Sequence, residues 1–400
     1  MRTKNFAYHL LALFVIAATL LAACGGGAAE VPATEAPAEA PAAEAPAAEV
    51  DWSTVASAAD GGGMDALIAA AQAEGTLNVI ALPEDWCNYG EMITTFSNKY
   101  GITVNSITPD AGSADEIQAI IDNKENPGPQ SPDVIDVGPA FGPLAKEQGL
   151  LAPYKVETWD TLDGVKDDGG YFYTDYNGVM VFEVNLDVVT DVPQDWADLL
   201  DPKYKGQVAL AGDPRASNQA AQTVYAAALA NGGSLDDIQP GLDFFKQLNE
   251  SGNLLPLIAN TGTIGKGETP ITFQWNYLAL ANNDSFAGNP PLEIVYPSSV
   301  NWGGFYLQGV SAYAPQPAAA RLWQEFLYSD EGQLIWMKGY CAPARLADML
   351  ERGVVPEDLA AKMPDPAILA SSVVPSGDQL SAARELIKNE WDNVVGLDIK

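Results

Sequence analysis

Short apolar segments that alternate with helix-like segments restrict the fold of this sequence more than any other feature. The expected helices are 66–73, 90–100, 114–123 and 144–148, and the expected strands between them are 76–82, 102–107 and 133–137. This alternation is typical of a parallel sheet covered by helices on both faces. It resumes with strands at 178–184 and 208–211 and a helix at 217–229. Because 400 residues suffice for two or three domains, the sequence predicts an α/β protein with two lobes.

The first 23 residues have the order of a bacterial export signal. Arg2 and Lys4 precede an apolar run at 10–21, and small residues lead to Cys24. The run is short for a transmembrane helix, and the whole segment matches a cleaved secretory signal. Residues 21–24, Leu-Ala-Ala-Cys, resemble the bacterial lipobox. We therefore expect residues 1–23 to be a lipoprotein signal peptide and Cys24 to carry the lipid, the alternative being an ordinary signal peptide.

Residues 24–60 are rich in alanine, proline and glutamate, and the repeated stretch contains no basic residue. Such a segment buries too little apolar surface to offset its chain entropy, and its prolines and like charges favour an extended chain. We expect a disordered tether between a lipid anchor and a folded body. An anchor with a spacer predicts that the body works in water at the outer face of the cytoplasmic membrane, in the periplasm or at the extracellular surface.

The charge composition and the scarcity of histidine exclude several function classes. The chain has 53 acidic and 20 basic residues, a net charge of −33, which argues against binding to nucleic acid. Its one histidine, His9, lies in the predicted signal peptide. The mature chain therefore has no Ser-His-Asp or Cys-His catalytic group and no histidine-ligated metal site. We expect no cofactor and no resident metal.

Three loops that follow predicted strands, 83–90, 138–142 and 212–218, combine backbone-permissive residues with polar or aromatic side chains. Open α/β sheets bind ligands beyond the carboxyl ends of their strands, where helix N-termini also present free N–H groups. We therefore select as candidate ligand-binding residues Glu84, Asp85, Trp86 and Tyr89 in the first loop, Phe141 in the second, and Asp213, Arg215, Ser217 and Asn218 in the third.

The first and third loops suit ligands of opposite charge. Carboxylates beside Trp86 and Tyr89 would bind a cationic amine through ion pairing and cation–π contact. The alternative is an acidic helix start with Trp86 in the core. Arg215 at a helix start would hold a carboxylate or phosphonate. The alternative there is a Ser or Asn N-cap beside a surface arginine.

A second group of aromatic residues lies further along the chain. Trp275 and Tyr277 follow a short strand at 271–273, and Trp302 and Phe305 flank a Gly-Gly pair. Aromatic side chains are more often core residues than ligand platforms, but exposed rings beside glycines are harder to explain by packing. We add these four residues to the candidate ligand-binding set.

The serial order of these segments resembles that of the bacterial extracellular solute-binding proteins of ABC importers, which have the two-lobed type II periplasmic-binding fold. The matching stretches are 132–138, 176–185, 204–208, 267–271 and 318–333. Together they cover most of residues 75–345, and it is their order that carries the resemblance. The nearest members of the family, by this pattern, bind ferric ion, polyamines, thiamine or phosphonates.

The resemblance implies how the chain is divided and how it works. Lobe 1 would comprise 61–180 and 301–400, lobe 2 would comprise 181–300, and the lobes would close by hinge motion on a ligand held in an interlobe cleft. A monomeric binding protein of this kind is not an enzyme. It would capture a small polar solute, here an organic amine or zwitterion of polyamine-like character, and deliver it to an ABC permease.

The sequence leaves three alternatives to this function open. A ferric-ion or phosphonate binder would have the same fold, although iron is the weaker choice because the chain has no Tyr-Tyr pair and no mature histidine. A secreted hydrolase that uses paired carboxylates would need no histidine. A surface scaffold would show a broad contact surface and no deep cleft between lobes.

Two cysteines, Cys87 and Cys341, remain after Cys24. An even number outside the cytoplasm suggests a disulfide. By the resemblance, the segment around Cys341 returns to lobe 1, where Cys87 follows the first strand. We predict that the two cysteines pair, the alternative being two reduced, buried thiols.

Overall fold

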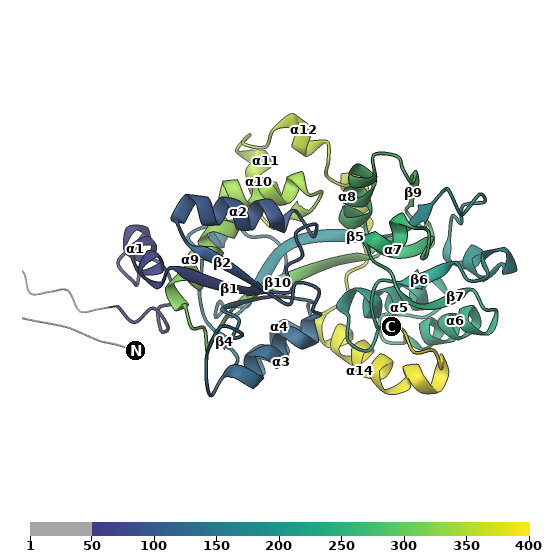
Figure 1. Cartoon of the computed structure of the whole chain (residues 1–400), viewed down its shortest axis with the longest axis horizontal. Helices are drawn as coiled ribbons and strands as arrows, with labels where there is room; N and C mark the ends of the chain where they lie inside the picture. Colours follow the sequence, from purple (N-terminus) through teal and green to yellow (C-terminus); the bar gives the residue numbers. More distant parts are fainter. Residues whose placement is uncertain (1–49) are drawn as a thin grey trace, which may run out of the picture. The chain divides into compact units, whose positions relative to one another are not determined.

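The computed structural model describes residues 50–400 (Figure 1). The predicted signal peptide 1–23, the lipidation site Cys24 and most of the predicted tether lie outside this range. No helix between residues 50 and 400 is long and apolar enough to cross a membrane.

The centre of the fold is a nine-stranded mixed sheet whose main strand order is β3-β10-β5-β8-β6-β7, and β1 and β2 form a separate parallel pair. The strands are β1 Thr76–Ile80, β2 Thr103–Ile107, β3 Val134–Val137, β4 Leu151–Ala152, β5 Tyr173–Asn185, β6 Val208–Leu210, β7 Leu254–Ile258, β8 Ile271–Trp275, β9 Leu292–Val295, β10 Gly303–Ser311 and β11 Ala342–Pro343.

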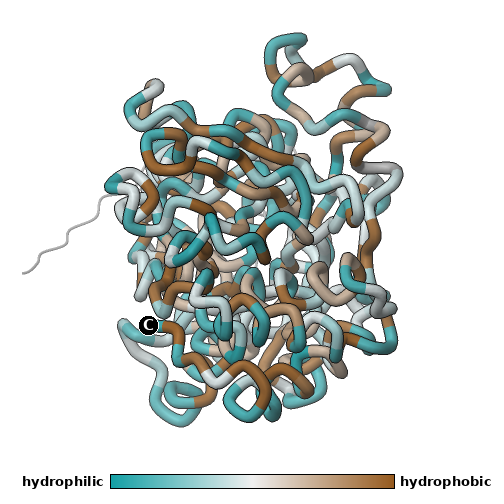
Figure 2. Tube along the Cα trace, turned by 90° about the vertical axis from the view of Figure 1, so that its right-hand side faces the viewer, coloured by the Kyte–Doolittle hydropathy of each residue, from teal (hydrophilic) through white to brown (hydrophobic). Residues whose placement is uncertain are grey.

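Helices cover the sheet on both sides (Figure 1). The helices are α1 Met64–Glu74, α2 Tyr89–Tyr100, α3 Ser113–Asn123, α4 Phe141–Glu147, α5 Asn218–Ala230, α6 Gln239–Glu250, α7 Thr261–Gly265, α8 Asn276–Phe286, α9 Pro317–Leu327, α10 Asp330–Lys338, α11 Leu346–Glu351, α12 Glu357–Ala360, α13 Pro366–Ser371 and α14 Gly377–Val394. Figure 2 shows apolar and polar residues interspersed along these segments.

The central strands are antiparallel, which corrects the expectation of a parallel sheet. Strand β10 pairs antiparallel with β3 and β5, and β5 pairs antiparallel with β8. Parallel pairing is confined to β1 with β2 and to β6 with its two neighbours. The difference arises because β5 and β10 cross the molecule in opposite directions, which a pattern of short alternating segments does not reveal.

Strand β5 divides the sheet into two portions because it is long enough to belong to both. Its first residues pair with β10 and β11, and its last residues pair with β8 and β9. We call the part built on β1–β4, β10 and the start of β5 lobe 1, and the part built on β6–β9 and the end of β5 lobe 2.

The end of the predicted tether is part of lobe 1. Trp52, Val55 and Ala58 are buried. The Arg321 guanidinium in α9 donates hydrogen bonds to the carbonyl oxygens of Ser53, at 3.0 Å, and Val55, at 2.8 Å. The tether boundary at residue 60 was therefore wrong: residues 51–60 carry apolar side chains with a site to pack into.

The C-terminal residues belong to lobe 2, not to lobe 1 as the resemblance implied. Helix α14 packs on α5 and α6, and the Trp391 ring centroid lies 5.8 Å from that of Phe245. The backbone N–H of Lys400 donates to Pro256 at 3.1 Å. The chain reaches lobe 2 along a third connection, where the Gly303 N–H donates to the Val373 carbonyl at 3.0 Å.

Candidate functional site

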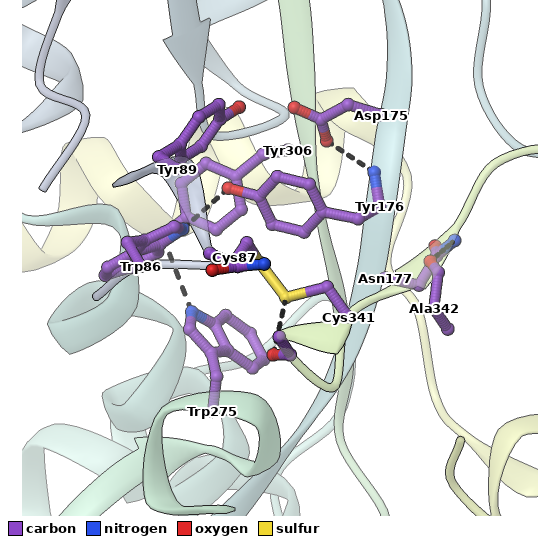
Figure 3. The surroundings of a disulfide bond; sticks show 12 residues. Trp86, Cys87, Tyr89, Asp175, Tyr176, Asn177, Trp275, Tyr306, Cys341 and Ala342 are labelled. Atoms are coloured by element: carbon purple, nitrogen blue, oxygen red, sulfur yellow. Dashed lines mark hydrogen bonds between the residues drawn. A yellow bond between two sulfur atoms is a disulfide. The ribbon is translucent and has the colours of Figure 1, made fainter. Parts of the chain in front are cut away.

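The loop after β1 is fixed at the boundary between the lobes by a disulfide. Cys87 and Cys341 are bonded, with Cα atoms 5.7 Å apart although they are 254 positions apart in sequence, so the predicted pairing is confirmed (Figure 3). A Cβ on Gly339 would lie only 2.7 Å from the backbone carbon of Cys87. Glycine at this position therefore lets the two segments approach closely.

Beside the disulfide, aromatic rings from both lobes meet. The Trp86 indole N–H donates to the Tyr176 hydroxyl at 2.6 Å. The Trp86 ring centroid lies 5.4 Å from that of Tyr306 in β10 and 5.8 Å from that of Tyr277 in α8. Figure 3 shows Trp86, Tyr176 and Tyr306 turned toward one another, with Trp275 below. We call Trp86, Tyr176, Trp275, Tyr277 and Tyr306 the interlobe aromatic cluster.

Asp136 lies against this cluster, one residue before the end of β3. Its Oδ2 accepts hydrogen bonds from the hydroxyls of Tyr89, at 2.8 Å, and Tyr176, at 3.1 Å. Its Oδ1 is buried and accepts no hydrogen bond from an N–H group or a hydroxyl, but the neighbouring Asp175 carboxyl, whose pKa is raised, forms a hydrogen bond with the Asp136 carboxylate. Burial raises the pKa of Asp136 to about 6, although its hydroxyl donors act in the opposite direction. The carboxyl therefore titrates close to neutral pH.

Two more buried carboxyls surround Asp136. Glu116 in α3 accepts a hydrogen bond from the Asp136 backbone N–H at 2.9 Å, and Asp175 in β5 accepts one from the Gln308 amide at 3.0 Å. Burial, and then the charge of Asp136, raise the pKa of both groups. In residues 50–400, none of the three carboxyls forms an ion pair with a lysine or arginine. This acidic cluster would be stabilised by a cation.

Lobe 2 contributes buried polar atoms that lack partners. The side-chain nitrogen of Asn218, the nitrogen of Asn276 and the hydroxyl of Tyr277 are buried without a hydrogen bond. Each unsatisfied buried group costs about 1–3 kcal/mol, and such groups are rare. Asn218 faces lobe 1, because a Cβ on Gly138 would lie 2.2 Å from its amide carbon. Polar atoms of lobe 2 thus meet the acidic cluster of lobe 1.

Two of the predicted residues lie elsewhere. Arg215 donates to Asp213, to Asp392 at 2.7 Å and to Asp398 at 2.8 Å, so the Asp213–Arg215 pair anchors the C-terminal segment on lobe 2. These contacts give both residues a structural role within lobe 2, and their part in ligand binding stays a prediction. The sequence showed the arginine beside a helix start but gave no sign of the aspartates more than 170 residues away.

For Ser217, Trp302 and Phe305, the structure agrees with the alternative of a helix N-cap or a core residue. Ser217 is the N-cap of α5, with its hydroxyl accepting from the Ala220 N–H at 3.3 Å. Trp302 is fully buried and donates to Gln222 at 2.9 Å, and Phe305 is buried in β10. Phe141 is also buried.

The two acidic residues of the first loop are exposed. Within residues 50–400, the Glu84 side chain forms no hydrogen bond or ion pair. Asp85 accepts a hydrogen bond from the Thr261 hydroxyl of lobe 2 at 3.2 Å. The acidic groups that face the aromatic cluster are therefore Asp136, Asp175 and Glu116, none of which the sequence singled out. The available signal was a carboxylate inside the apolar strand 133–137. Within the described range, no three histidine, cysteine, aspartate or glutamate side chains are grouped to hold a metal ion.

Similarity to known sequences covers more than half of the chain. Residues 129–370 match the family described as bacterial extracellular solute-binding protein. An uncharacterized protein of Haemophilus influenzae is 31% identical over 263 residues, covering 61% of this chain and 70% of that protein. A putative 2-aminoethylphosphonate-binding periplasmic protein of Salmonella typhimurium is 26% identical over 253 residues, with the same coverage.

Solved structures show the same fold at lower sequence identity. The periplasmic binding protein AfuA of Actinobacillus pleuropneumoniae, with fructose-6-phosphate bound, superposes with a TM-score of 0.64 at 22% identity, covering 80% of this chain and 98% of that one. A putative spermidine/putrescine ABC transporter protein of Listeria monocytogenes gives a TM-score of 0.60 at 20% identity, covering 79% and 98%. The type II periplasmic-binding fold is thus confirmed.

The sequence match spans more than half of the chain, and the fold agrees with it. Since the family consists of solute-binding transport components, the hydrolase alternative is excluded. The chain belongs to the bacterial extracellular solute-binding proteins, and it is a binding protein and not an enzyme.

Proposed function

We propose that this protein is the substrate-binding component of an ABC importer and that it captures a small organic amine between its two lobes. The family supports the transport role. Two of the similar proteins are named after amines: one after spermidine and putrescine, the other after 2-aminoethylphosphonate. The substrate class rests mainly on the chemistry of the interlobe boundary.

The observation that carries this proposal is the acidic cluster beside aromatic rings. Asp136 and Asp175 are buried carboxyls that hydrogen-bond to each other and have no lysine or arginine partner in residues 50–400, and the tyrosines that donate to Asp136 belong to or adjoin the interlobe aromatic cluster. An ammonium group would pair with this carboxylate and lie against the ring faces. A hydrogen bond to a charged group contributes about 1.5–3 kcal/mol, and a cation–π contact adds about 0.5–2 kcal/mol.

Delivery to a permease and attachment to the membrane belong to the same proposal. The leader, Cys24 and the Ala/Pro/Glu segment support a lipid-anchored protein outside the cytoplasm. The disulfide agrees with an oxidising compartment. Partition of the expressed protein between membrane and soluble fractions tests the anchor.

Replacement of Asp136 tests the substrate class. A thermal-shift screen with putrescine, ethanolamine and 2-aminoethylphosphonate selects a ligand, since binding to the native state raises the melting temperature. Calorimetry then compares the wild type with Asp136→Asn, which keeps the shape of the side chain but loses its charge. We expect the affinity to fall about 100-fold, equivalent to about 2.7 kcal/mol.

The control is Asp110→Asn, which removes one charge at an exposed position of lobe 1. This variant should bind with wild-type affinity. Equal affinities for the wild type and Asp136→Asn would remove the acidic cluster from the site. Failure of the wild type to bind any amine would contradict the proposed substrate class.

A further inference from the structure

One arginine differs from all others in the described chain. The five arginines there are Arg215, Arg321, Arg345, Arg352 and Arg384. The first four donate hydrogen bonds to carboxylates or backbone carbonyls. Among residues 50–400, Arg384 in α14 has no such acceptor, although it is partly buried and burial lowers its pKa. A guanidinium carries five donors, so leaving it unpaired away from water is costly.

Arg384 lies at the boundary between the two lobes. Its guanidinium carbon lies 3.7 Å from the ring centroid of Phe141, the first residue of α4 in lobe 1. Helix α14 itself packs on lobe 2. The stacking on Phe141 orients the planar guanidinium but satisfies none of its N–H groups.

A small cavity lies between Arg384 and the start of α5. It is lined by residues of both lobes, among them Ala140, Asn218, Gln222, Tyr225, Ala383 and Arg384. Its volume of ≈ 10 Å³ is about the space of one water molecule. An anionic group therefore fits only when the lobes separate or Arg384 turns away from Phe141.

A second, independent observation at the same cavity concerns Asn218. Its side chain is 7% exposed, its oxygen accepts from Gln222 at 3.1 Å, and its nitrogen forms no hydrogen bond of good geometry, although the Tyr306 hydroxyl lies beside the amide. Asn218 is the first residue of α5, a helix of 13 residues whose N-terminus favours negative charge. An unpaired amide N–H and an unpaired guanidinium thus line one cavity at a helix N-terminus.

We propose that Arg384 and Asn218 bind the anionic group, a carboxylate or phosphonate, of a zwitterionic ligand whose ammonium lies at Asp136. This inference rests on the proposed function and narrows its substrate class from amines to amines that carry an anion. Asp136 and Phe141 belong to one short segment of lobe 1, and Gly138 between them contacts Asn218. The acidic and basic ends are therefore held by the same loop. Arginine suits this role because its planar fork binds carboxylate and phosphonate oxygens in pairs.

The test compares ligands that share an amine but differ at the other end. Calorimetry measures the affinities of 2-aminoethylphosphonate, γ-aminobutyrate, putrescine and methylphosphonate for the wild type, Arg384→Gln and Arg384→Lys. We expect Arg384→Gln to weaken the two zwitterions about 10–100-fold and to leave putrescine unchanged or tighter. Arg384→Lys, which retains the charge but not the fork, should recover part of the loss. The control is Arg352→Gln, which removes an arginine paired with Asp330 and Asp348 and should change no affinity.

The outcomes separate this inference from the proposed function. If the wild type binds the zwitterions and Arg384→Gln binds them equally well, Arg384 is not a ligand residue, whereas the amine site stands. Equal weakening of putrescine and the zwitterions would assign Arg384 to lobe closure and overturn the inference. If only methylphosphonate binds, and Arg384→Gln abolishes that binding, the anion site stands and the amine site fails. If no ligand binds, both proposals fail.

Discussion

The loop after β1 and the loop after β6 have similar sequences in one respect: each follows a strand and carries charged residues beside a helix start. In the structure they serve different purposes. The first, fixed by Cys87–Cys341, brings Trp86 to the boundary between the lobes. The second turns its charged pair, Asp213 and Arg215, toward the C-terminal segment.

The comparison shows that a charged side chain is available to a ligand only where its hydrogen-bonding groups are not already used by the protein. The Arg215 guanidinium is occupied by three aspartates of the same chain, so little of it remains for a ligand. Arg384 and Asp136 form no ion pair within residues 50–400, and each adjoins the other lobe. A ligand is therefore expected where charges without an ion-pair partner lie at the boundary between the lobes.

Removal of the disulfide should have the largest effect. The double variant Cys87→Ser, Cys341→Ser opens a link between residues 254 positions apart, and we expect the free energy of unfolding to fall by about 2–5 kcal/mol. Urea unfolding of the oxidised wild type and the variant measures the change. The wild type unfolded with a reductant serves as the control and should match the variant. Equal stability of oxidised and reduced wild type would show that the first loop is not held by this bond.

The second prediction concerns the pH dependence of stability, because the pKa values of Asp136 and Asp398, one near each loop, are shifted in opposite directions. Burial raises the pKa of Asp136 to about 6, so the native state keeps a proton that the unfolded chain loses near pH 4. Its contribution to the free energy of unfolding therefore falls as pH rises from about 4 through 6, by about 2–3 kcal/mol. Hydrogen bonds from Lys400 and Arg215 lower the pKa of Asp398, whose contribution is complete above pH 4 and is lost only in stronger acid.

Urea unfolding at pH 4.5 and 7.5 separates these contributions. The wild type should lose more stability between the two values than Asp136→Asn, whereas Asp398→Asn should lose as much as the wild type. Other buried carboxyls with raised pKa values, such as Glu325, change all three proteins alike. Identical losses in the wild type and Asp136→Asn would contradict the burial of a titrating group beside the first loop.

The smallest effect is expected at Arg215. Its partners Asp392 and Asp398 are largely exposed, and exposed ion pairs contribute about 0–1 kcal/mol each. Arg215→Gln should therefore lower the free energy of unfolding by about 1 kcal/mol and increase hydrogen exchange in residues 392–400. Ligand affinity should stay within about twofold of the wild type. A loss of affinity as large as that of Arg384→Gln would show that Arg215 does contact the ligand.

Local elements were predictable where their signals lie within a few residues. Helix α2 begins one residue before the expected start and ends where expected, because Gly101 in a left-handed conformation terminates it. Strand β5 is longer than the expected 178–184 because polar residues such as Asp175 are buried there by pairing with β10 and β11. The position of α14 on lobe 2 depends on contacts such as Trp391 with Phe245, which no local pattern encodes.

The candidate site was predictable only in part. Trp86, Tyr89, Asn218 and Tyr277 follow strand ends or begin helices, and the structure brings them to the interlobe boundary. Asp136, Tyr176 and Tyr306 lie within strands, where an aromatic or polar residue indicates nothing until the neighbouring strand is known. Their convergence results from antiparallel pairing between segments more than 100 residues apart.

The three connections between the lobes have a mechanical consequence. Strand β5, the start of β10 and the segment around Val373 run next to one another, joined by backbone hydrogen bonds at Asn301 and Gly303. Three attachments in a row permit bending about a single axis and resist both sliding and torsion. Each time the two halves separate and come together, Asn218 should therefore return opposite Gly138, and little configurational freedom is left to be lost when a molecule is trapped.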